Sequence, residues 1–168
     1  MNSQNKVIIF DIGHPANVHI FKNIYRLLED RGWMCYFTLV NKDVTSDLLI
    51  AYDLKFFKLG DNVTGLLRKL FKIPMTTYKF AWRVLLVKPS IIISRGSLHS
   101  SIVAKILRIP HIVLTDTEAA GRLNKISNLL ADSVMTSNSY QDDCGMRHIR
   151  YPGYHELFYL HPNRFKPN

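Results

Sequence analysis

Four polar segments, each following an apolar run, carry residue types that could bind or activate a ligand. The first is Asp11-Ile-Gly-His-Pro-Ala-Asn17, where Gly13 permits a tight turn and His14 could be a general base near neutral pH. A helix beginning near Asn17 would point free N–H groups at the same place and make an anion site. The alternative is that His14 only hydrogen-bonds the turn, and the sequence leaves both open.

The second segment is Ser94-Arg-Gly-Ser-Leu-His-Ser-Ser101. Gly96 and Ser97 would open another helix N-terminus, and Arg95 could pair with a phosphate or carboxylate. The alternative is a capped helix, with Ser97 as its cap and Arg95 in solvent. The segment lacks the Gly-Lys-Ser/Thr ending of a Walker A loop, and the chain lacks a Gly-x-Gly-x-x-Gly dinucleotide motif.

The third and fourth segments bring carboxylates and a further histidine. Asp116 and Glu118, with Arg122 nearby, suit acid/base work or recognition of sugar hydroxyls, while the alternative is that they cap a helix. His155 and Glu156 follow the glycine turn at residue 153. They do not form the His-Glu-x-x-His pattern of a zinc protease. We expect no metal site and no bound cofactor.

Short β-branched runs alternate with segments of helical period, which predicts a Rossmann-like α/β fold: a parallel sheet with helices on both faces. The expected strands are 6–11, 33–40, 54–59, 90–94, 110–115, 133–136 and 148–151. The expected helices are 18–31, a short one carrying Leu48, Leu49 and Tyr52, 64–87 broken by Pro74, 97–107, 122–130 and 139–144. In such sheets ligands bind beyond the carboxyl ends of the strands, and all four polar segments follow expected strands.

Length and composition fit one globular domain. The chain has 168 residues and 47% hydrophobic residues, without an apolar run long enough to span a membrane or act as a signal peptide, so we expect a cytoplasmic protein. Cys35 and Cys144 have no metal-ligand spacing, and a disulfide framework is not expected.

The net charge of +9 favours acidic partners, although solubility alone could account for it. Cationic and aromatic residues at helical spacing in 66–87 make a candidate contact with a membrane surface. The simpler alternative is an ordinary surface helix with a solvated basic face. The sequence carries no recognisable nucleic-acid-binding motif, and we expect no nucleic acid partner.

With these residues in view, the chain resembles an uncharacterised prokaryotic family of predicted glycosyltransferases. The resemblance rests on the stretches 11–23, 116–118 and 153–165. It implies the N-terminal, acceptor-side domain of a GT-B enzyme, in which two Rossmann-like domains face each other across a cleft. The family is similar to the lipid-linked N-acetylglucosamine transferase of peptidoglycan synthesis and to UDP-N-acetylglucosamine 2-epimerase.

The resemblance implies roles for particular residues. The Gly13-His14 turn resembles the glycine-histidine loop of the transferase, whose histidine lies at the active site. Glu118 matches a catalytic glutamate of the epimerase, and Arg122 follows it in a stretch whose middle residues are rearranged. Ser94 to Ser97 stands where the epimerase carries a catalytic aspartate, and no aspartate is present. Residues 153–156 resemble the turn where GT-B chains leave their first domain.

From the resemblance we expect a hexosyltransferase using a nucleotide-sugar donor, held mainly by a second domain, and a sugar, lipid-linked or polysaccharide acceptor. Residues 1–160 would be the acceptor-side domain and 161–168 the start of a linker, so the chain alone would be inactive and could dimerise. Peripheral contact with the inner membrane would accompany a lipid-linked acceptor. One alternative is a nucleotide-sugar 2-epimerase, and another is a non-enzymatic domain that binds an anionic partner.

Overall fold

The computed structural model describes residues 6–41, 44–61, 66–116 and 122–163, without the side chains of residues 41, 66–72, 122 and 123. It contains one seven-stranded sheet in the order β3-β2-β1-β4-β5-β6-β7, and every neighbouring pair is parallel. The predicted Rossmann-like parallel sheet is therefore confirmed. The strands are β1 Val7–Ile12, β2 Met34–Asn41, β3 Phe56–Asp61, β4 Ile91–Ser94, β5 His111–Leu114, β6 Ser133–Ser137 and β7 His148–Tyr151.

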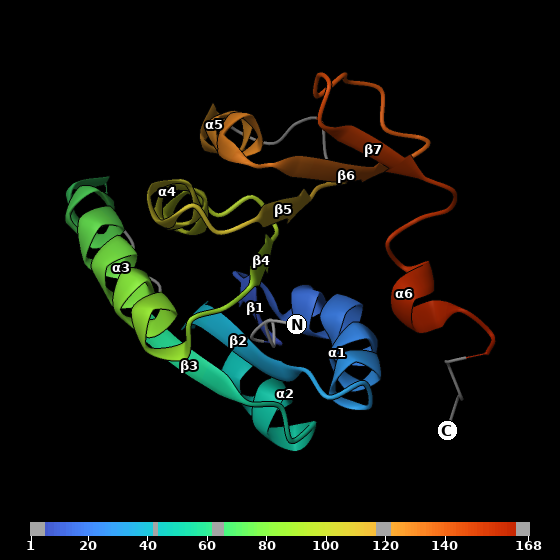
Figure 1. The fold of residues 1–168 in the computed structure, drawn as a ribbon, viewed down its shortest axis with the longest axis horizontal. Helices are drawn as coiled ribbons and strands as arrows, with labels where there is room; N and C mark the ends of the chain where they lie inside the picture. Colours follow the sequence, from blue (N-terminus) through green and yellow to red (C-terminus); the bar gives the residue numbers. More distant parts are fainter. Residues whose placement is uncertain (1–5, 42–43, 62–65, 117–121, 164–168) are drawn as a thin grey trace, which may run out of the picture.

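Helices cover both faces of the sheet (Figure 1). On one face, α1 and α2 pack on β1 and β2 around the buried ring of Phe10, whose centroid lies 5.2 Å from Phe21 and 5.4 Å from Phe37. On the other face, α3 and α4 bury Phe80 and Val103 against the central strands. The helices are α1 Pro15–Glu29, α2 Thr45–Ala51, α3 Leu66–Val87, α4 Leu98–Leu107, α5 Arg122–Leu130 and α6 Leu157–Leu160.

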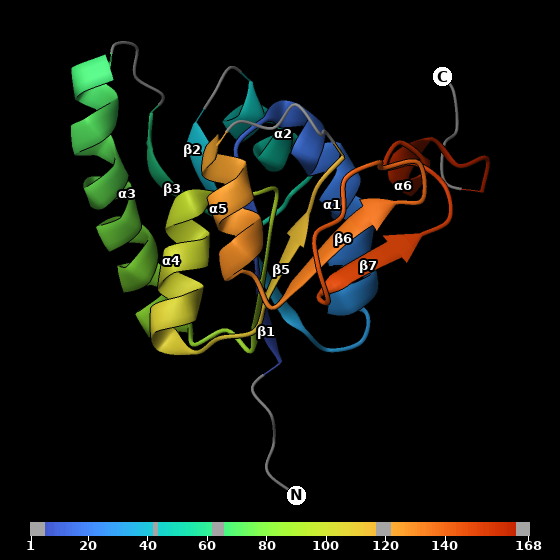
Figure 2. The same ribbon diagram turned by 90° about the horizontal axis from the view of Figure 1, so that it is seen from above.

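The strand order reverses beside β1. The chain runs from β1 out to β2 and β3, and β4 then pairs with the other edge of β1, so that Asp11 lies in register with Ser94. Loops from these two strands therefore leave the sheet side by side and turn in opposite directions. This reversal is where open α/β sheets bind ligands. Figure 2 shows the arrowheads of β5 and β6 pointing towards the edge of the sheet where the strands end.

Two helix predictions were wrong. Residues 66–87 form one helix that continues through Pro74, so the proline does not break it. Proline removes one backbone hydrogen bond, and the remaining turns on both sides are enough to keep this helix continuous. Residues 139–144 are not helical, because their polar groups are bonded otherwise: Ser139 N–H donates to the Ser137 hydroxyl, and the Arg150 guanidinium donates to the carbonyls of Tyr140 and Asp142.

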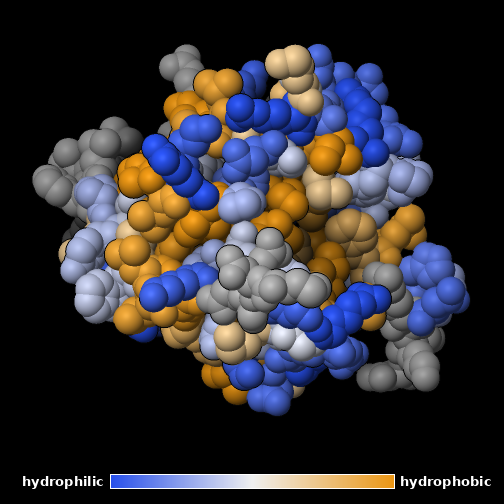
Figure 3. Space-filling model, in the orientation of Figure 1, coloured by the Kyte–Doolittle hydropathy of each residue, from blue (hydrophilic) through white to orange (hydrophobic). Residues whose placement is uncertain are grey.

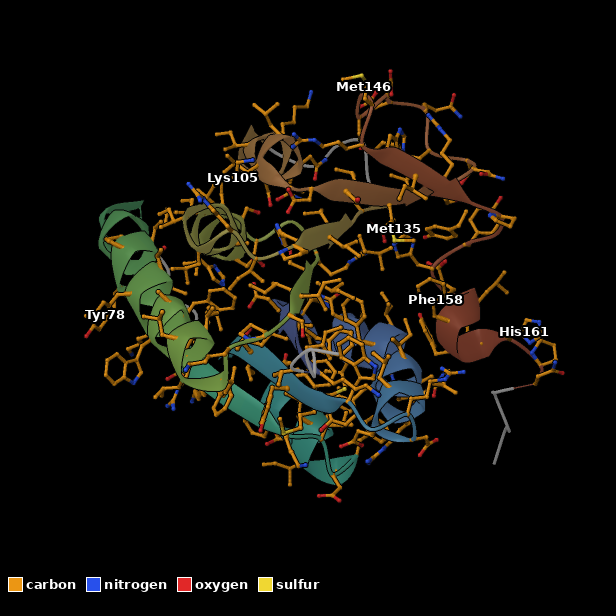
Figure 4. All side chains as sticks on the ribbon, viewed as in Figure 1. Tyr78, Lys105, Met135, Met146, Phe158 and His161 are labelled. Atoms are coloured by element: carbon orange, nitrogen blue, oxygen red, sulfur yellow. The ribbon has the colours of Figure 1, made fainter. Side chains whose placement is uncertain are left out.

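The last helix lies back against the first. Asn23 of α1 donates a 2.8 Å hydrogen bond to the carbonyl of Phe158 in α6, and the rings of His19 and Tyr159 lie 5.8 Å apart. Figure 4 shows Phe158 on the same side of the sheet as Met135 of β6. The segment after β7 is therefore packed on the body of the domain at least as far as α6.

Candidate functional site

The carboxyl edge of the sheet brings together the polar segments that follow β1, β4, β5 and β7. His14 lies one residue beyond Gly13, after β1, and is the N-cap of α1. Its Nδ1 accepts a 3.2 Å hydrogen bond from Ala16 N–H. Helix α1 thus begins three residues earlier than predicted, because His14 caps its N-terminus and Pro15 is a favourable first residue.

This cap determines which atom of His14 can react. A neutral imidazole that accepts at Nδ1 carries its proton on Nε2, so in this rotamer it is a donor towards the open side. To accept a proton from a ligand, the ring must release Ala16 N–H and turn. The same movement would free that N–H for a ligand.

The first turn of α1 does not offer the free N–H donors that the sequence suggested. Pro15 has none, Ala16 N–H is bonded to the His14 ring, and Asn17 N–H donates to the His14 carbonyl at 3.0 Å. Asn17 is itself buried. Gly13 differs from the prediction as well: its φ is not positive, and a Cβ built there would have nothing within 4 Å. The space above Gly13 is open, so its lack of a side chain leaves room for a ligand and is not required by the turn.

A buried carboxylate lies beneath these loops. Asp11 is fully buried near the end of β1, where Oδ1 accepts a 2.8 Å hydrogen bond from Thr38 of β2 and Oδ2 lies 3.0 Å from Nε2 of His99. His99 is in the first turn of α4, and its ring meets Phe80 edge-on. Burial by itself would raise the pKa of Asp11, but the charge and hydrogen bond of His99, with hydrogen bonds from Ser97 and Thr38, outweigh it and lower the pKa below 3.8. Asp11 is therefore ionised at neutral pH.

The Asp11 charge also explains the start of α4. Ser97 is the N-cap residue, yet its side chain makes no capping hydrogen bond to the helix, and it helps to lower the pKa of Asp11. The first turn of α4 thus has no side-chain cap, unlike that of α1. Gly96 precedes it with φ +84°, and a Cβ there would lie 3.3 Å from Asn124 Cγ. Here the glycine is required by the backbone.

Arg95 does not extend into solvent. Its side chain is only 15% exposed, and Nη2 lies 2.5 Å from Oδ2 of Asp116, which follows β5. Nη1 is buried with no hydrogen-bond partner among the described residues. The pair joins the second and third polar segments, and it leaves one guanidinium nitrogen that a ligand oxygen could satisfy.

The fourth segment reaches the same place. Tyr151, the last residue of β7, lies with its hydroxyl 2.6 Å from Nδ1 of the buried His155. Burial and, to a smaller extent, the charge of Arg95 lower the pKa of His155 to about 4, although Asp116 and Glu156 act in the other direction. Burial likewise raises the pKa of Tyr151 to about 12, against the effect of Arg95. At neutral pH both groups are uncharged hydrogen-bonding groups.

A second buried histidine supports β4. Nε2 of His111 lies 2.9 Å from the Ser94 hydroxyl, which also accepts from Gly96 N–H at 3.3 Å. Burial lowers the pKa of His111 to about 4, although Asp11 and Asp132 act in the other direction. Ser94 and His111 are both inaccessible, so they hold the loop and do not contact a ligand.

The structure thus divides the predicted residues into two neighbouring groups. One is Gly13, His14 and Asn17 after β1, whose neighbour in the sheet is β4, and the other is Arg95, Asp116, His155 and the exposed Glu156. Glu118 lies outside the described residues, as does the Arg122 side chain. Among the described residues, no group of three or more His, Cys, Asp or Glu side chains could hold a metal ion.

Sequence reasoning assigned no role at this edge to Asp11, His99, His111 or Tyr151. Asp11 had a signal of its own, since a charged residue inside a buried apolar strand requires a partner. Nothing in the spacing identified His99 as that partner. Tyr151 and His155 are four residues apart but meet across the turn at Pro152 and Gly153, which no helical pattern reports.

This arrangement of loops at the carboxyl edge can be compared with known proteins. Residues 6–161 match the model of the family described as "Protein of unknown function (DUF354)". The chain belongs to this family. A search of the curated proteins gives no match.

Solved structures share the fold at low sequence identity. MurG of Acinetobacter baumannii superposes with a TM-score of 0.64 and 16% identity over 82% of this chain and 43% of its own. MnaA of S. aureus, solved with UDP, superposes with a TM-score of 0.69 and 12% identity over 97% of this chain and 50% of its own. The UDP-GlcNAc 2-epimerase of Neisseria meningitidis, bound to UDP-GlcNAc, superposes with a TM-score of 0.62 and 12% identity. The match covers 77% of this chain and 40% of the epimerase chain.

This likeness establishes the fold, which is that of one Rossmann-like domain of the GT-B type, as the resemblance implied. The chain spans half or less of the length of these neighbours.

Proposed function

We propose that this chain is the acceptor-side domain of a glycosyltransferase that transfers a hexose from a nucleotide-sugar to an acceptor hydroxyl. The proposal is supported by the topology: the loop after β1, which carries His14, and the loop after β4, which carries Arg95 and leads into the uncapped α4, leave neighbouring strands where the strand order reverses, and Arg95 pairs with Asp116. The structural neighbours, which include proteins solved with UDP and with UDP-GlcNAc, support a nucleotide-sugar as the ligand class.

The proposed chemistry assigns His14 the role of base. After its ring releases Ala16 N–H, the imidazole takes the proton of the acceptor hydroxyl, and that oxygen attacks the anomeric carbon of the donor. The bond from the anomeric carbon to the diphosphate breaks, and the nucleoside diphosphate leaves. Asp116, together with Glu118, orients the acceptor hydroxyl.

Cationic and N–H groups would hold the phosphates in this proposal. The unpartnered Nη1 of Arg95 and the uncapped N–H groups of α4 favour negative charge, while the charge of the buried Asp11 beneath these loops opposes it. Most contacts with the donor would come from a second domain, so we expect the chain by itself to be inactive. A lipid-linked acceptor would bring residues 66–87 near the inner membrane surface.

An assay of nucleotide-sugars by ¹H NMR, with the longest natural form that contains this chain, tests the reaction. We expect slow release of nucleoside diphosphate, accelerated by acceptor-containing cell-envelope extract and reduced in His14→Asn. If an epimeric nucleotide-sugar forms without acceptor, the protein is an epimerase and not a glycosyltransferase. If neither reaction occurs, with or without the extract, the proposal is wrong.

A further inference from the structure

Helices α3 and α4 leave an apolar groove on the outer side of the domain. Phe80 and Val84 are the inward residues of α3 and pack on Val103 of α4. The next stripe around α3, which includes Ala81 and Leu85, lines a cavity of about 470 Å³ with residues of α4. The groove therefore lies above a core that is already closed, and filling it is not needed for the fold.

The groove and the adjoining outer side of α3 expose large apolar side chains. Tyr78 is 67% exposed, Trp82 54%, Leu85 56% and Ile106 71%. Figure 4 shows Tyr78 projecting from α3 away from the sheet, and Figure 3 shows apolar residues gathered over α3 and α4 at the left. Contiguous exposed apolar surface marks a binding surface, and Trp and Tyr on a helix are typical of membrane–water interfaces.

The charge of the chain is concentrated in the same segment. Residues 62–115 contain nine Lys and Arg and no Asp or Glu, whereas the rest of the chain has thirteen of each sign, so this segment carries the whole net charge of +9. Lys79 and Arg83 line, with Trp82, a recess of about 310 Å³ between α3 and β3. Lys105 is exposed on α4 next to Ile106, so cations flank the apolar rim on both sides.

We propose that the α3–α4 face binds the surface of an anionic phospholipid bilayer, with Tyr78, Trp82, Leu85 and Ile106 entering the headgroup layer. Apolar residues in the middle, cations at both margins and no acidic residue on either helix suit a layer of negative charge over an apolar interior. A folded protein partner presents both signs of charge and would favour a mixed surface. This binding does not depend on the proposed reaction.

Flotation with vesicles tests the proposal. We expect the protein to float with phosphatidylglycerol-containing vesicles, to remain behind with pure phosphatidylcholine, and to detach as salt is raised. Lys79→Glu with Arg83→Glu should weaken binding by about 30-fold or more, since each basic residue at an anionic surface contributes about fivefold. Leu85→Ala should also weaken it, by several-fold.

Matched variants on the opposite face separate this site from a general charge effect. Lys22→Glu with Lys55→Glu makes the same change of net charge, and Ile50→Ala on α2 removes a similarly exposed apolar side chain. These should leave binding within about twofold, because they lie outside the contact. Three results would overturn the proposal. The two sets of variants could lose vesicle binding equally, the protein could bind neutral vesicles as well, or it could bind single-stranded DNA but no vesicles. Absence of nucleotide-sugar turnover would not contradict the proposed membrane binding.

Discussion

Oδ2 of the buried Asp11 lies 3.0 Å from Nε2 of His99, and this carboxylate–imidazole contact ties the central strand β1 to the first turn of α4. The Asp11→Asn variant should lose about 1–3 kcal/mol of unfolding free energy, because the buried polar groups around Asp11, Thr38 among them, lose the carboxylate that accepts from them. Urea unfolding monitored by circular dichroism would measure the loss. Asp47→Asn, an exposed aspartate in the first turn of α2, is the control and should change stability by about 0.5 kcal/mol or less.

The Asp11 pair also predicts a pH dependence. Its folded pKa lies below 3.8, so the stabilisation is present above that value and is lost as pH falls through the lower folded pKa. Acid unfolding should therefore begin below pH 4 for this group and become shallower in Asp11→Asn. If unfolding free energy falls with acid pH in the same way in the variant and in the unaltered protein, Asp11 is not ionised in the folded protein.

His111 and His155 predict a second loss of stability at higher pH. Burial lowers both pKa values to about 4, so the unfolded chain takes up protons between pH 6.5 and about 4 while the folded protein does not. Their stabilisation is complete above pH 6.5 and falls by up to about 3 kcal/mol for each histidine as pH drops through that range. Titration of unfolding free energy should show a smaller slope in His155→Gln and no change in His161→Gln, an exposed histidine.

His14 has a capping role that can be separated from a catalytic one. His14→Ala should lose about 1 kcal/mol of stability with the α1 cap, whereas His14→Asn should retain it, because asparagine is a good N-cap. If His14 is the base, both variants should lose about 10²-fold or more in turnover. Normal turnover in His14→Asn would restrict His14 to the helix cap.

The two glycines of the site should respond differently to alanine. Gly13→Ala should leave stability unchanged within about 0.5 kcal/mol, because neither its φ nor its surroundings oppose a Cβ. Gly96→Ala should cost more than about 1 kcal/mol, since φ +84° and Asn124 both oppose it. Thermal melts would measure both. Reduced ligand binding by a fully stable Gly13→Ala variant would indicate that a ligand approaches there, and unchanged binding would exclude it.

The sequence predicted most of the fold because the signals were local. The apolar period of Val18, Phe21 and Tyr25 identified α1, and β-branched runs identified all seven strands to within two residues. It failed where a distant group decided the outcome: the carbonyls of Tyr140 and Asp142 are bonded by Arg150, which prevents the expected helix at 139–144.

The location of the candidate site could be predicted from the sequence, but the side-chain contacts within it could not. Parallel strands carry their following loops to one edge, so the convergence of residues 13–17, 95–97 and 116 followed from the topology. The pairing of Arg95 with Asp116 and of Asp11 with His99 depends on side-chain directions across strands, which spacing does not specify.

The central claim is that the edge formed by His14, Ser97 and Arg95 takes part in nucleotide-sugar chemistry. Its most direct test is calorimetric titration of UDP-, GDP- and CMP-sugars into this chain and into the longest natural protein that contains it, each also as Arg95→Gln. We expect the longer protein to bind one class of nucleotide-sugar, this chain to bind it weakly or not at all, and Arg95→Gln to reduce binding by about tenfold or more. Failure of the longer protein to bind any member of the panel would contradict the account.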